Sequence, residues 1–183
     1  MEHICHYKSP LGGITAAGDG SALTGLWFDD QKYFAYTLDA EHEEQTDDIL
    51  EETVRWLDIY FSGKEPDFMP PLCMKGSSLR QRVWEILLKI PYGRTMTYAQ
   101  IAGIIAKERG IPKMSAQAVG GAVGHNSISL IIPCHRVVGT DGSLTGYAGG
   151  IDKKAWLLKN EGADMSRLYI PGLQHSEDAD HFS

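Results

Sequence analysis

Residues 127–135 read SISLIIPCH, and this stretch decides how the chain is interpreted. Alternating and then continuous apolar residues predict a short buried strand over residues 127–132, which Pro133 ends. A cysteine and a histidine, Cys134 and His135, follow at once on the bend after that strand. Segments that a rigid element positions in this way often carry functional side chains. The Cys-His pair is therefore the first candidate site.

Two short helices are predicted before the strand. Residues 97–100, TYAQ, have the form of a capping box, which places Tyr98 at the first position of a helix that Gly110 breaks. Ser115 is expected to cap a second helix, over residues 116–124. Two short helices around a glycine-containing break are typical of a helix-turn-helix, although many helical hairpins share the pattern.

After the Cys-His pair, a glycine-rich loop over residues 139–150 leads to a last helix. Asp152 is expected to cap that helix and Gly162 to close it. Glu161 then lies at the helix C-terminus, where the macrodipole disfavours an acid by some tenths of a kcal/mol. An acid held against that field often has a specific partner, but a solvated surface carboxylate is an equally good interpretation of Glu161 alone.

The first half of the chain has a different pattern. Short runs with turn signals between them predict β structure over the first forty residues. A helix capped by Thr46 or Asp47 is expected to follow, and Gly63 to stop it. Prolines and a change in charge mark a linker from about residue 66.

These elements predict an α+β protein with two domains. The N-terminal domain covers residues 1–75 and the mainly helical C-terminal domain covers residues 76–166, with an acidic, disordered tail over residues 167–183. The net charge of −7 is unevenly spread: residues 1–75 hold fifteen acidic and five basic residues, whereas residues 76–163 hold eleven basic and five acidic ones. A basic middle segment is able to face phosphate, although a charge split alone more often reflects solubility.

Length, composition and cysteine content exclude several classes of protein. The chain has 183 residues, 43% of them hydrophobic and 22% charged, as in ordinary globular domains. No apolar run reaches the roughly 20 residues of a membrane span, and no signal peptide is evident. Three widely spaced cysteines without a CxxC pair argue against a disulfide framework and against a metal site built on Cys5. We therefore expect a cytoplasmic protein without a bound metal.

Cys134 is able to act as a nucleophile once its thiol ionises, which a nearby imidazole or helix N-terminus promotes. Adjacent residues on a helical turn do not face each other, so His135 is expected to reach the sulfur through a water molecule. Glu161 is expected to accept the ring N–H of His135 and to fix its tautomer. The three residues would form a nucleophile, a base and an orienting acid. The competing interpretation is that Cys134 is simply a small buried apolar residue.

The helix expected over residues 116–124, AQAVGGAVG, contains three glycines. Each costs about 1 kcal/mol relative to alanine inside a helix. Small residues permit close approach, either by another helix, which is the commoner cause, or by a nucleic-acid backbone. Ser115 and Gln117 stand at the helix start, where backbone N–H groups point outward towards phosphate.

Together these residues resemble the O6-alkylguanine-DNA alkyltransferases, also called methylated-DNA–protein-cysteine methyltransferases. The resemblance centres on IPCHRVVG, residues 132–139, and extends from QAVGGA and Asn126 before them to YAGG, WLL and EG after them. It is strong over residues 78–163 and looser over the N-terminal domain. It implies a small N-terminal sheet-and-helix domain that is RNase H-like, and a C-terminal domain of helix-turn-helix, winged-helix-like architecture.

The resemblance also implies a reaction. Cys134 would attack the O6-alkyl carbon of a guanine flipped out of duplex DNA, with His135 accepting its proton through water and Glu161 steadying His135. Asn126 would brace the recognition helix to the active-site strand, and Tyr98 would hydrogen-bond the flipped guanine and crowd its phosphate. The residues implied for the base pocket are Tyr147, Ala148, Val137 and Val123, and those for DNA binding are Gln117, Ser115 and Tyr98.

The product would be a thioether, which offers no leaving group under mild conditions, so each molecule would act once. The implied partner is duplex DNA that contains O6-alkylguanine or O4-alkylthymine, bound by a monomer with no cofactor and no membrane contact. One departure is Gln117, because many family members carry an arginine there. Glutamine brings no charge. The slope of log K against log salt for DNA binding is therefore expected to be shallower, by the contribution of up to one phosphate contact.

Two other functions stay open on the residues alone. A thiol acyl hydrolase also uses a cysteine, a histidine and an acid, but it needs an oxyanion hole and a base in contact with the sulfur. A non-catalytic lesion-binding or regulatory DNA-binding protein would replace the reactive cysteine or carry sequence-reading side chains on its recognition helix. This chain keeps Cys134 and has mainly Ala, Val and Gly on that helix.

Overall fold

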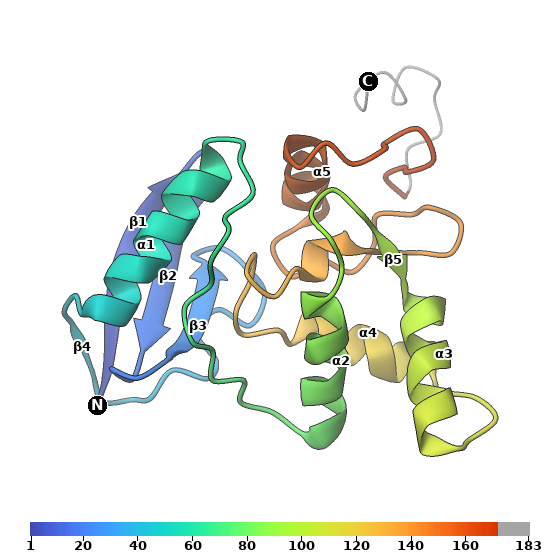
Figure 1. Ribbon diagram of the computed structural model, residues 1–183, viewed down its shortest axis with the longest axis horizontal. Coiled ribbons are helices and arrows are strands. Elements are labelled where there is room, and N and C mark those ends of the chain that lie inside the picture. Colours follow the sequence, from blue (N-terminus) through green and yellow to red (C-terminus); the bar gives the residue numbers. More distant parts are fainter. Residues whose placement is uncertain (172–183) are drawn as a thin grey trace. The chain divides into compact units, whose positions relative to one another are not determined.

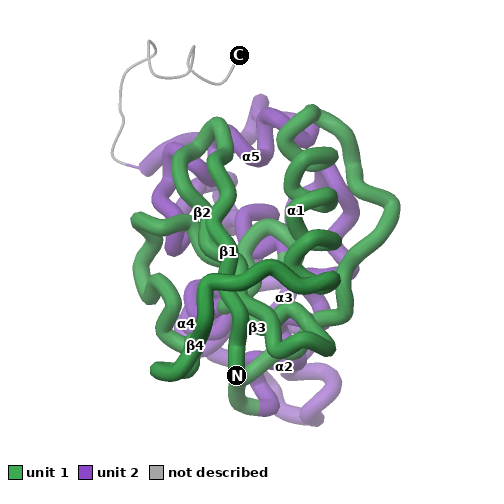
Figure 2. Tube along the Cα trace, turned by 90° about the vertical axis from the view of Figure 1, so that its left-hand side faces the viewer, with its two compact units in different colours: residues 1–77, 127–132 green, residues 78–126, 133–183 purple. Residues whose placement is uncertain are grey.

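The computed structural model describes residues 1–171. They fold into two compact units (Figure 2): unit 1 comprises residues 1–77 and 127–132, and unit 2 comprises residues 78–126 and the described residues from 133 onward. Residues 127–132, which the sequence assigns to the C-terminal domain, thus group with the first part of the chain. None of the helices in residues 1–171 has the length and apolar content needed to cross a membrane.

Unit 1 is built on a four-stranded sheet with the strand order β3-β2-β1-β4 (Figure 1). The strands are β1 (Glu2–Ser9), β2 (Gly12–Gly18), β3 (Leu23–Phe28) and β4 (His42–Glu44). The first three form antiparallel pairs, as the short runs and turns predict. The short β4, parallel to β1, was not predicted, because its three residues are polar and exposed and lack the alternation that marks a half-buried strand.

Helix α1 (Asp48–Phe61) packs on this sheet. Asp47 caps it, since its carboxylate accepts a hydrogen bond from the Leu50 N–H at 2.9 Å. The helix ends at Ser62, and Gly63 follows with a φ of +89°, a conformation that favours glycine. Both ends therefore lie where the sequence predicts them.

The predicted strand over residues 127–132 is wrong. Ile128 makes only an isolated bridge to Leu26 of β3, and the chain turns at Leu130, which has a φ of +71°. The Ile132 N–H then donates to the Ile128 carbonyl at 3.1 Å. The apolar residues are buried, but in a turn and not in a ladder of strands. A short apolar run predicts burial, and periodicity alone does not decide which backbone achieves it.

Unit 2 is mainly helical. Its elements are α2 (Ser78–Leu88), β5 (Met96–Thr97), α3 (Tyr98–Arg109), α4 (Ala116–Gly124), the 3₁₀ helix η1 (Cys134–Arg136), β6 (Val137–Val138) and α5 (Ile151–Asn160). The short strands β5 and β6 pair in parallel. Helices α2 and α4 are held together by Trp84, whose fully buried indole N–H donates to the Ala122 carbonyl at 2.8 Å.

The predicted helix pair is present as α3 and α4. Thr97 and Gln100 complete the capping box of α3, so Tyr98 is its first residue, and Gly110 ends it with a φ of +66°. Ser115 caps α4 by accepting a hydrogen bond from the Ala118 N–H. The α+β class with a helix-turn-helix in its second half is therefore confirmed.

The predicted N-cap of α5 is wrong. The helix begins at Ile151 directly after Gly150, whose φ is +102°, so Asp152 lies within the first turn. The helix macrodipole still stabilises an acid in the first turn. The positive φ at the residue before the helix, however, requires a glycine.

The expected tail does not begin at residue 167. Leu168 and Ile170 pack against a buried cluster of Val138, Leu144 and Leu158. The Leu144 N–H also donates to the Tyr169 carbonyl at 2.9 Å. The packed part of unit 2 thus continues to Ile170, and the rest of the expected tail, residues 172–183, lies outside the described residues.

Candidate active site

Cys134 is the first residue of η1 and is 4% exposed. The Asn126 side chain and the backbone N–H groups of Cys134 and His135 lie around its sulfur and favour its ionised form. Burial raises the pKa of the thiol, and these donors, together with the charge of Lys154, lower it only in part. The resting sulfur therefore carries its proton. The sequence suggested a thiol pKa lowered by its surroundings, and burial overrides that effect here.

His135 and Glu161 form a buried pair. Nε2 of His135 lies 2.6 Å from Oε2 of Glu161, and both side chains are fully shielded from solvent. Burial lowers the pKa of His135, so its imidazole is neutral. An ionised Glu161 accepts only the tautomer with its proton on Nε2, which leaves Nδ1 as the basic nitrogen. The expected contact between the histidine and the orienting acid is present.

Three donors hold the Glu161 carboxylate. Besides His135, the Arg136 guanidinium donates through Nε at 2.8 Å and the Gly93 N–H donates at 3.1 Å. Burial alone raises the pKa of Glu161, but His135 and Arg136 outweigh it and keep that pKa far below its ordinary value. Arg136 is itself held by the Ile90 carbonyl at 2.8 Å. An acid at the C-cap of α5 is thus explained by specific partners and not by the helix field.

Sequence reasoning missed Arg136 and Gly93. Arg136 stands next to the Cys-His pair, but nothing in its position indicates that it turns towards Glu161. Gly93 is 68 residues away from Glu161 along the chain, and only the fold brings them together.

Replacement of Gly93 is expected to loosen the Glu161 carboxylate. Gly93 has a φ of +76°, and a Cβ there would lie 2.8 Å from the Glu161 carbonyl oxygen. We expect Gly93→Ala to lower the free energy of unfolding by roughly 1–3 kcal/mol, measured by urea denaturation. Gly103→Ala is the control, because a Cβ there meets open space on helix α3. An equal or smaller loss in Gly93→Ala than in the control would contradict this role.

Two tyrosines flank the cysteine. The Tyr98 hydroxyl donates to the Thr145 carbonyl at 3.0 Å, and burial, with a further contribution from Cys134, raises the pKa of Tyr98 to about 12, so it stays a donor. The Tyr147 ring is buried, with its centre 6.4 Å from that of His135 at an angle of 79°. Its hydroxyl is buried without a hydrogen-bond partner among residues 1–171. Buried hydroxyls are usually paired, so this one favours a polar ligand at the site.

The other residues predicted for the base pocket and for DNA binding differ in how far they are buried. Val123 and Val137 are buried, and Ala148 is half-buried in the loop before α5. Ser115 and Gln117 are exposed at the start of α4. The structure thus places the expected chemical groups in the interior of unit 2 and the expected DNA contacts on its surface.

The glycines of α4 are not explained by helix packing, which was the commoner cause expected from the sequence. A Cβ added at Gly120, Gly121 or Gly124 would meet no atom within 4 Å. The space beside these residues is open, so close approach by another helix of the described chain does not require them. An outside partner that approaches the backbone is the explanation that fits this geometry.

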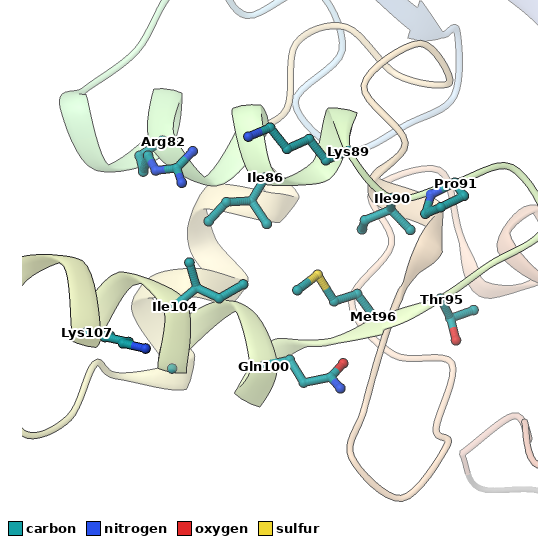
Figure 3. A pocket seen from close by; sticks show the side chains of 11 residues that line it. Arg82, Ile86, Lys89, Ile90, Pro91, Thr95, Met96, Gln100, Ile104 and Lys107 are labelled. Carbon is teal, nitrogen blue, oxygen red and sulfur yellow. The ribbon is translucent and has the colours of Figure 1, made fainter.

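A groove of about 830 Å³ lies elsewhere in unit 2, between α2 and α3 (Figure 3). Ile86 of α2 and Ile104 of α3 line its opposite sides, and Arg82 and Lys107 stand at one end. Of the residues discussed above, Ile90, whose carbonyl holds Arg136, lines the groove, whereas Cys134, His135 and Glu161 do not. Among residues 1–171, no three His, Cys, Asp or Glu side chains gather closely enough to hold a metal ion.

Comparison with known proteins gives matches over both halves of the chain. Residues 78–163 match the family model described as 6-O-methylguanine DNA methyltransferase, DNA binding domain. Residues 5–73 match the model described as 6-O-methylguanine DNA methyltransferase, ribonuclease-like domain. The second description agrees with the RNase H-like domain that the resemblance implies.

Individual relatives give the same result. A methylated-DNA–protein-cysteine methyltransferase of Mycobacterium bovis is 43% identical over 161 residues, which cover 86% of this chain and 93% of the relative. One of Methanosarcina acetivorans is 42% identical over 157 residues, covering 86% and 96%. Among solved structures, Mycobacterium tuberculosis OGT in complex with DNA has a TM-score of 0.74 at 42% identity, covering 87% of this chain and 92% of that one.

Proposed function

This chain belongs to the 6-O-methylguanine DNA methyltransferase family, and from that premise we propose that it repairs duplex DNA by moving the alkyl group of O6-alkylguanine onto its own Cys134. One observation carries the assignment of the residues: a buried cysteine stands next to a buried histidine whose tautomer is fixed by Glu161. A buried thiol reaches a guanine only if the base leaves the helix stack, so the reaction includes base flipping.

The reaction starts with a proton transfer. The Cys134 thiol is protonated at rest, and Nδ1 of His135 takes that proton through a water molecule as the alkylated base enters. The Glu161 carboxylate stabilises the imidazolium that forms, and Arg136 keeps Glu161 ionised. Asn126 steadies the sulfur with its amide while the negative charge develops.

The sulfur then attacks the alkyl carbon. A bond between sulfur and carbon forms, the bond between that carbon and O6 breaks, and its electron pair stays on the guanine. The guanine takes up the proton held by the His135 imidazolium, either directly or through the Tyr98 hydroxyl, which gives one proton to the base, receives one from the imidazolium and so ends neutral. The net change converts a thiol and an alkylguanine into a thioether and a guanine. Water does not displace a thiolate from a thioether under mild conditions, so the protein is consumed.

The DNA lies, in this proposal, across the start and the glycine face of α4. Ser115 and Gln117 are exposed at the N-terminus of that helix, where free N–H groups attract phosphate. The open space at Gly120, Gly121 and Gly124 allows a nucleic-acid backbone to approach. Residues 76–166 would thus hold both DNA binding and chemistry, as the division into domains predicts.

A Gln117→Arg variant is expected to bind duplex DNA more tightly and with a steeper salt dependence. An arginine there adds one positive charge at the proposed interface, so the slope of log K against log salt should steepen by about one. Fluorescence anisotropy with a labelled duplex at several salt concentrations measures it. Lys113→Gln, which removes a charge two residues before the helix cap, should change the slope in the opposite direction. An unchanged slope in Gln117→Arg would place this residue away from the DNA.

The function is tested by the stoichiometry of repair. We expect one equivalent of protein to repair one equivalent of O6-methylguanine in duplex DNA and then to stop. Continued turnover of an ester or amide substrate without lasting modification would support a thiol hydrolase. Binding of the methylated duplex without repair would support a lesion-binding protein. The three cysteines are free in the structure. Free cysteines are typical of the reducing cytoplasm, and a cytoplasmic location is part of this proposal.

A further inference from the structure

The chain continues past helix α5 and returns along the loop of residues 139–150, which carries Tyr147. Residues 163–170, which we call the strap, form this return. No step of the proposed reaction uses them. Five of the twelve residues in the loop are glycine. Glycine gives a backbone many accessible conformations, so a loop of this composition needs contacts from outside to keep a single one.

The strap pairs with the loop through backbone hydrogen bonds. The Leu144 N–H donates to the Tyr169 carbonyl at 2.9 Å, and the Tyr169 N–H donates to the Gly142 carbonyl at 3.1 Å. Ser143 and Tyr169 form a parallel β-bridge between these bonds. The Tyr169 hydroxyl also donates to Oδ2 of Asp141 at 2.5 Å. Tyr169 thus contacts a continuous stretch of the loop.

Apolar packing gives the strap an anchor on unit 2. Leu168 and Ile170 pack against a buried cluster that includes Leu144. Leu144 is fully buried and is itself part of the loop. Tyr169 is exposed, so its place is set by the packed residues on either side of it. The same cluster therefore fixes both the strap and the middle of the loop.

The close approach of the strap depends on Gly142. This residue has a φ of +91°, and a Cβ there would lie 1.9 Å from the Arg167 carbonyl oxygen. A side chain at this position has no room between the two segments. A glycine at residue 142 is therefore required by the strap as well as by its own backbone conformation.

The next loop residue after Leu144 contacts the candidate site. The Thr145 carbonyl accepts a hydrogen bond from the Tyr98 hydroxyl at 3.0 Å. Tyr147 follows two residues later, with its ring centre 6.4 Å from that of His135. The strap fixes the loop at Leu144 and Tyr98 fixes it at Thr145, so a displacement of the strap is transmitted to Tyr147.

We propose, on the basis of the function proposed above, that the strap is a positioning element for alkyl transfer: it holds the loop so that Tyr147 stays in place beside His135 when a flipped base enters. The strap contacts neither the sulfur nor the base in this proposal. The proposed DNA contacts lie on α4, so the strap acts on the transfer step and not on the affinity for DNA.

The test uses two full-length variants, each with a matched control. Gly142→Ala places a Cβ against the strap, and Gly20→Ala is its control, because Gly20 has a similar φ of +89° but a Cβ there meets no atom within 4 Å. Leu168→Asp places a charge in the apolar contact of the strap and leaves the loop sequence unchanged. Met69→Asp, at an exposed methionine of unit 1, is its control.

Hydrogen exchange of the loop amides shows whether the strap holds the loop. We expect residues 142–147 to exchange roughly tenfold faster in Gly142→Ala and Leu168→Asp, and at the wild-type rate in both controls. Wild-type protection of the loop in both strap variants would overturn the proposal. In the wild type, the Leu144 and Tyr169 amides should have equal protection factors, because both bonds break when the strap leaves. Unequal factors would contradict the pairing even if the variants fail to fold.

Single-turnover methyl transfer from O6-methylguanine DNA then separates rate from affinity. A small displacement of a positioning group costs up to about 10² in rate, and we expect a roughly tenfold fall at saturating DNA in both strap variants. The DNA concentration at half-maximal rate should change by less than about twofold. Faster exchange with an unchanged rate would leave the strap as a structural element only. If the wild type takes up no methyl group, the proposed function fails, whereas the exchange data still decide whether the strap holds the loop.

Discussion

A Cys134→Ala variant is expected to take up no methyl group from O6-methylguanine DNA. The sulfur is the atom that forms the new bond, and no neighbouring side chain in the site offers a replacement nucleophile of similar strength. The substitution is small and buried, so the unfolding free energy should fall by no more than about 1 kcal/mol. Binding of the methylated duplex should therefore persist, because the DNA contacts proposed for α4 are untouched.

Two measurements on this variant separate chemistry from folding. Mass spectrometry of the protein after incubation with the methylated duplex reports methyl uptake, and anisotropy with the same duplex reports binding. Cys73→Ala, a replacement of a free cysteine in unit 1, is the control and should be methylated like the wild type. Methyl uptake by Cys134→Ala would contradict the assignment of Cys134 as the nucleophile.

A Glu161→Gln variant is expected to lose most of the rate while it still binds DNA. The amide removes the negative charge that stabilises the His135 imidazolium and keeps Arg136 paired. His135 then acts poorly as the general base, and general-base catalysis is worth a factor of roughly 10²–10⁴, which single-turnover methyl transfer to the protein measures. Glu51→Gln, a replacement of an exposed acid on α1, is the control and should keep the full rate. A rate within a factor of about three of the wild type would contradict the role of Glu161 in stabilising the His135 imidazolium.

The difference in unfolding free energy between the wild type and Glu161→Gln is expected to depend on pH. The folded pKa of Glu161 lies far below its ordinary value of 4.5, so its ionised form stabilises the fold above that pH. As the pH falls below about 4.5, the unfolded chain takes up the proton first, and the contribution is lost. At pH 7, removal of one partner from a buried ion pair costs roughly 3–5 kcal/mol. Denaturant unfolding should therefore show the gap between wild type and Glu161→Gln narrowing towards pH 3.

Local signals in the sequence predicted much of the fold. Asp47, Thr97 and Ser115 each cap the helix that the sequence assigns to them, because a cap needs only its own side chain and the next turn. The run over residues 127–132 was misassigned, because a buried turn and a buried strand share the same apolar residues. Asp152 was misassigned as a cap because the decisive feature is the positive φ of Gly150.

The candidate site was predictable in its reactive groups but not in its supports. Cys134, His135 and Glu161 are residue types whose chemistry indicates a use, and their positions next to helix ends strengthen that indication. Arg136 and Gly93 have no such signal, since their contacts with Glu161 arise only in the folded chain. The raised pKa of the Cys134 thiol was also not predictable, because it follows from burial and not from neighbours in the sequence.

In the proposed reaction, one buried sulfur accepts one alkyl group and keeps it. The most direct measurement is the intact mass of the protein after exposure to excess duplex DNA with O6-methylguanine, followed by mapping of the modified peptide. We expect a mass increase of a single methyl group, located on Cys134 and stable during prolonged incubation. An unmodified protein that has nonetheless repaired the DNA, or a methyl group on another residue, would contradict it.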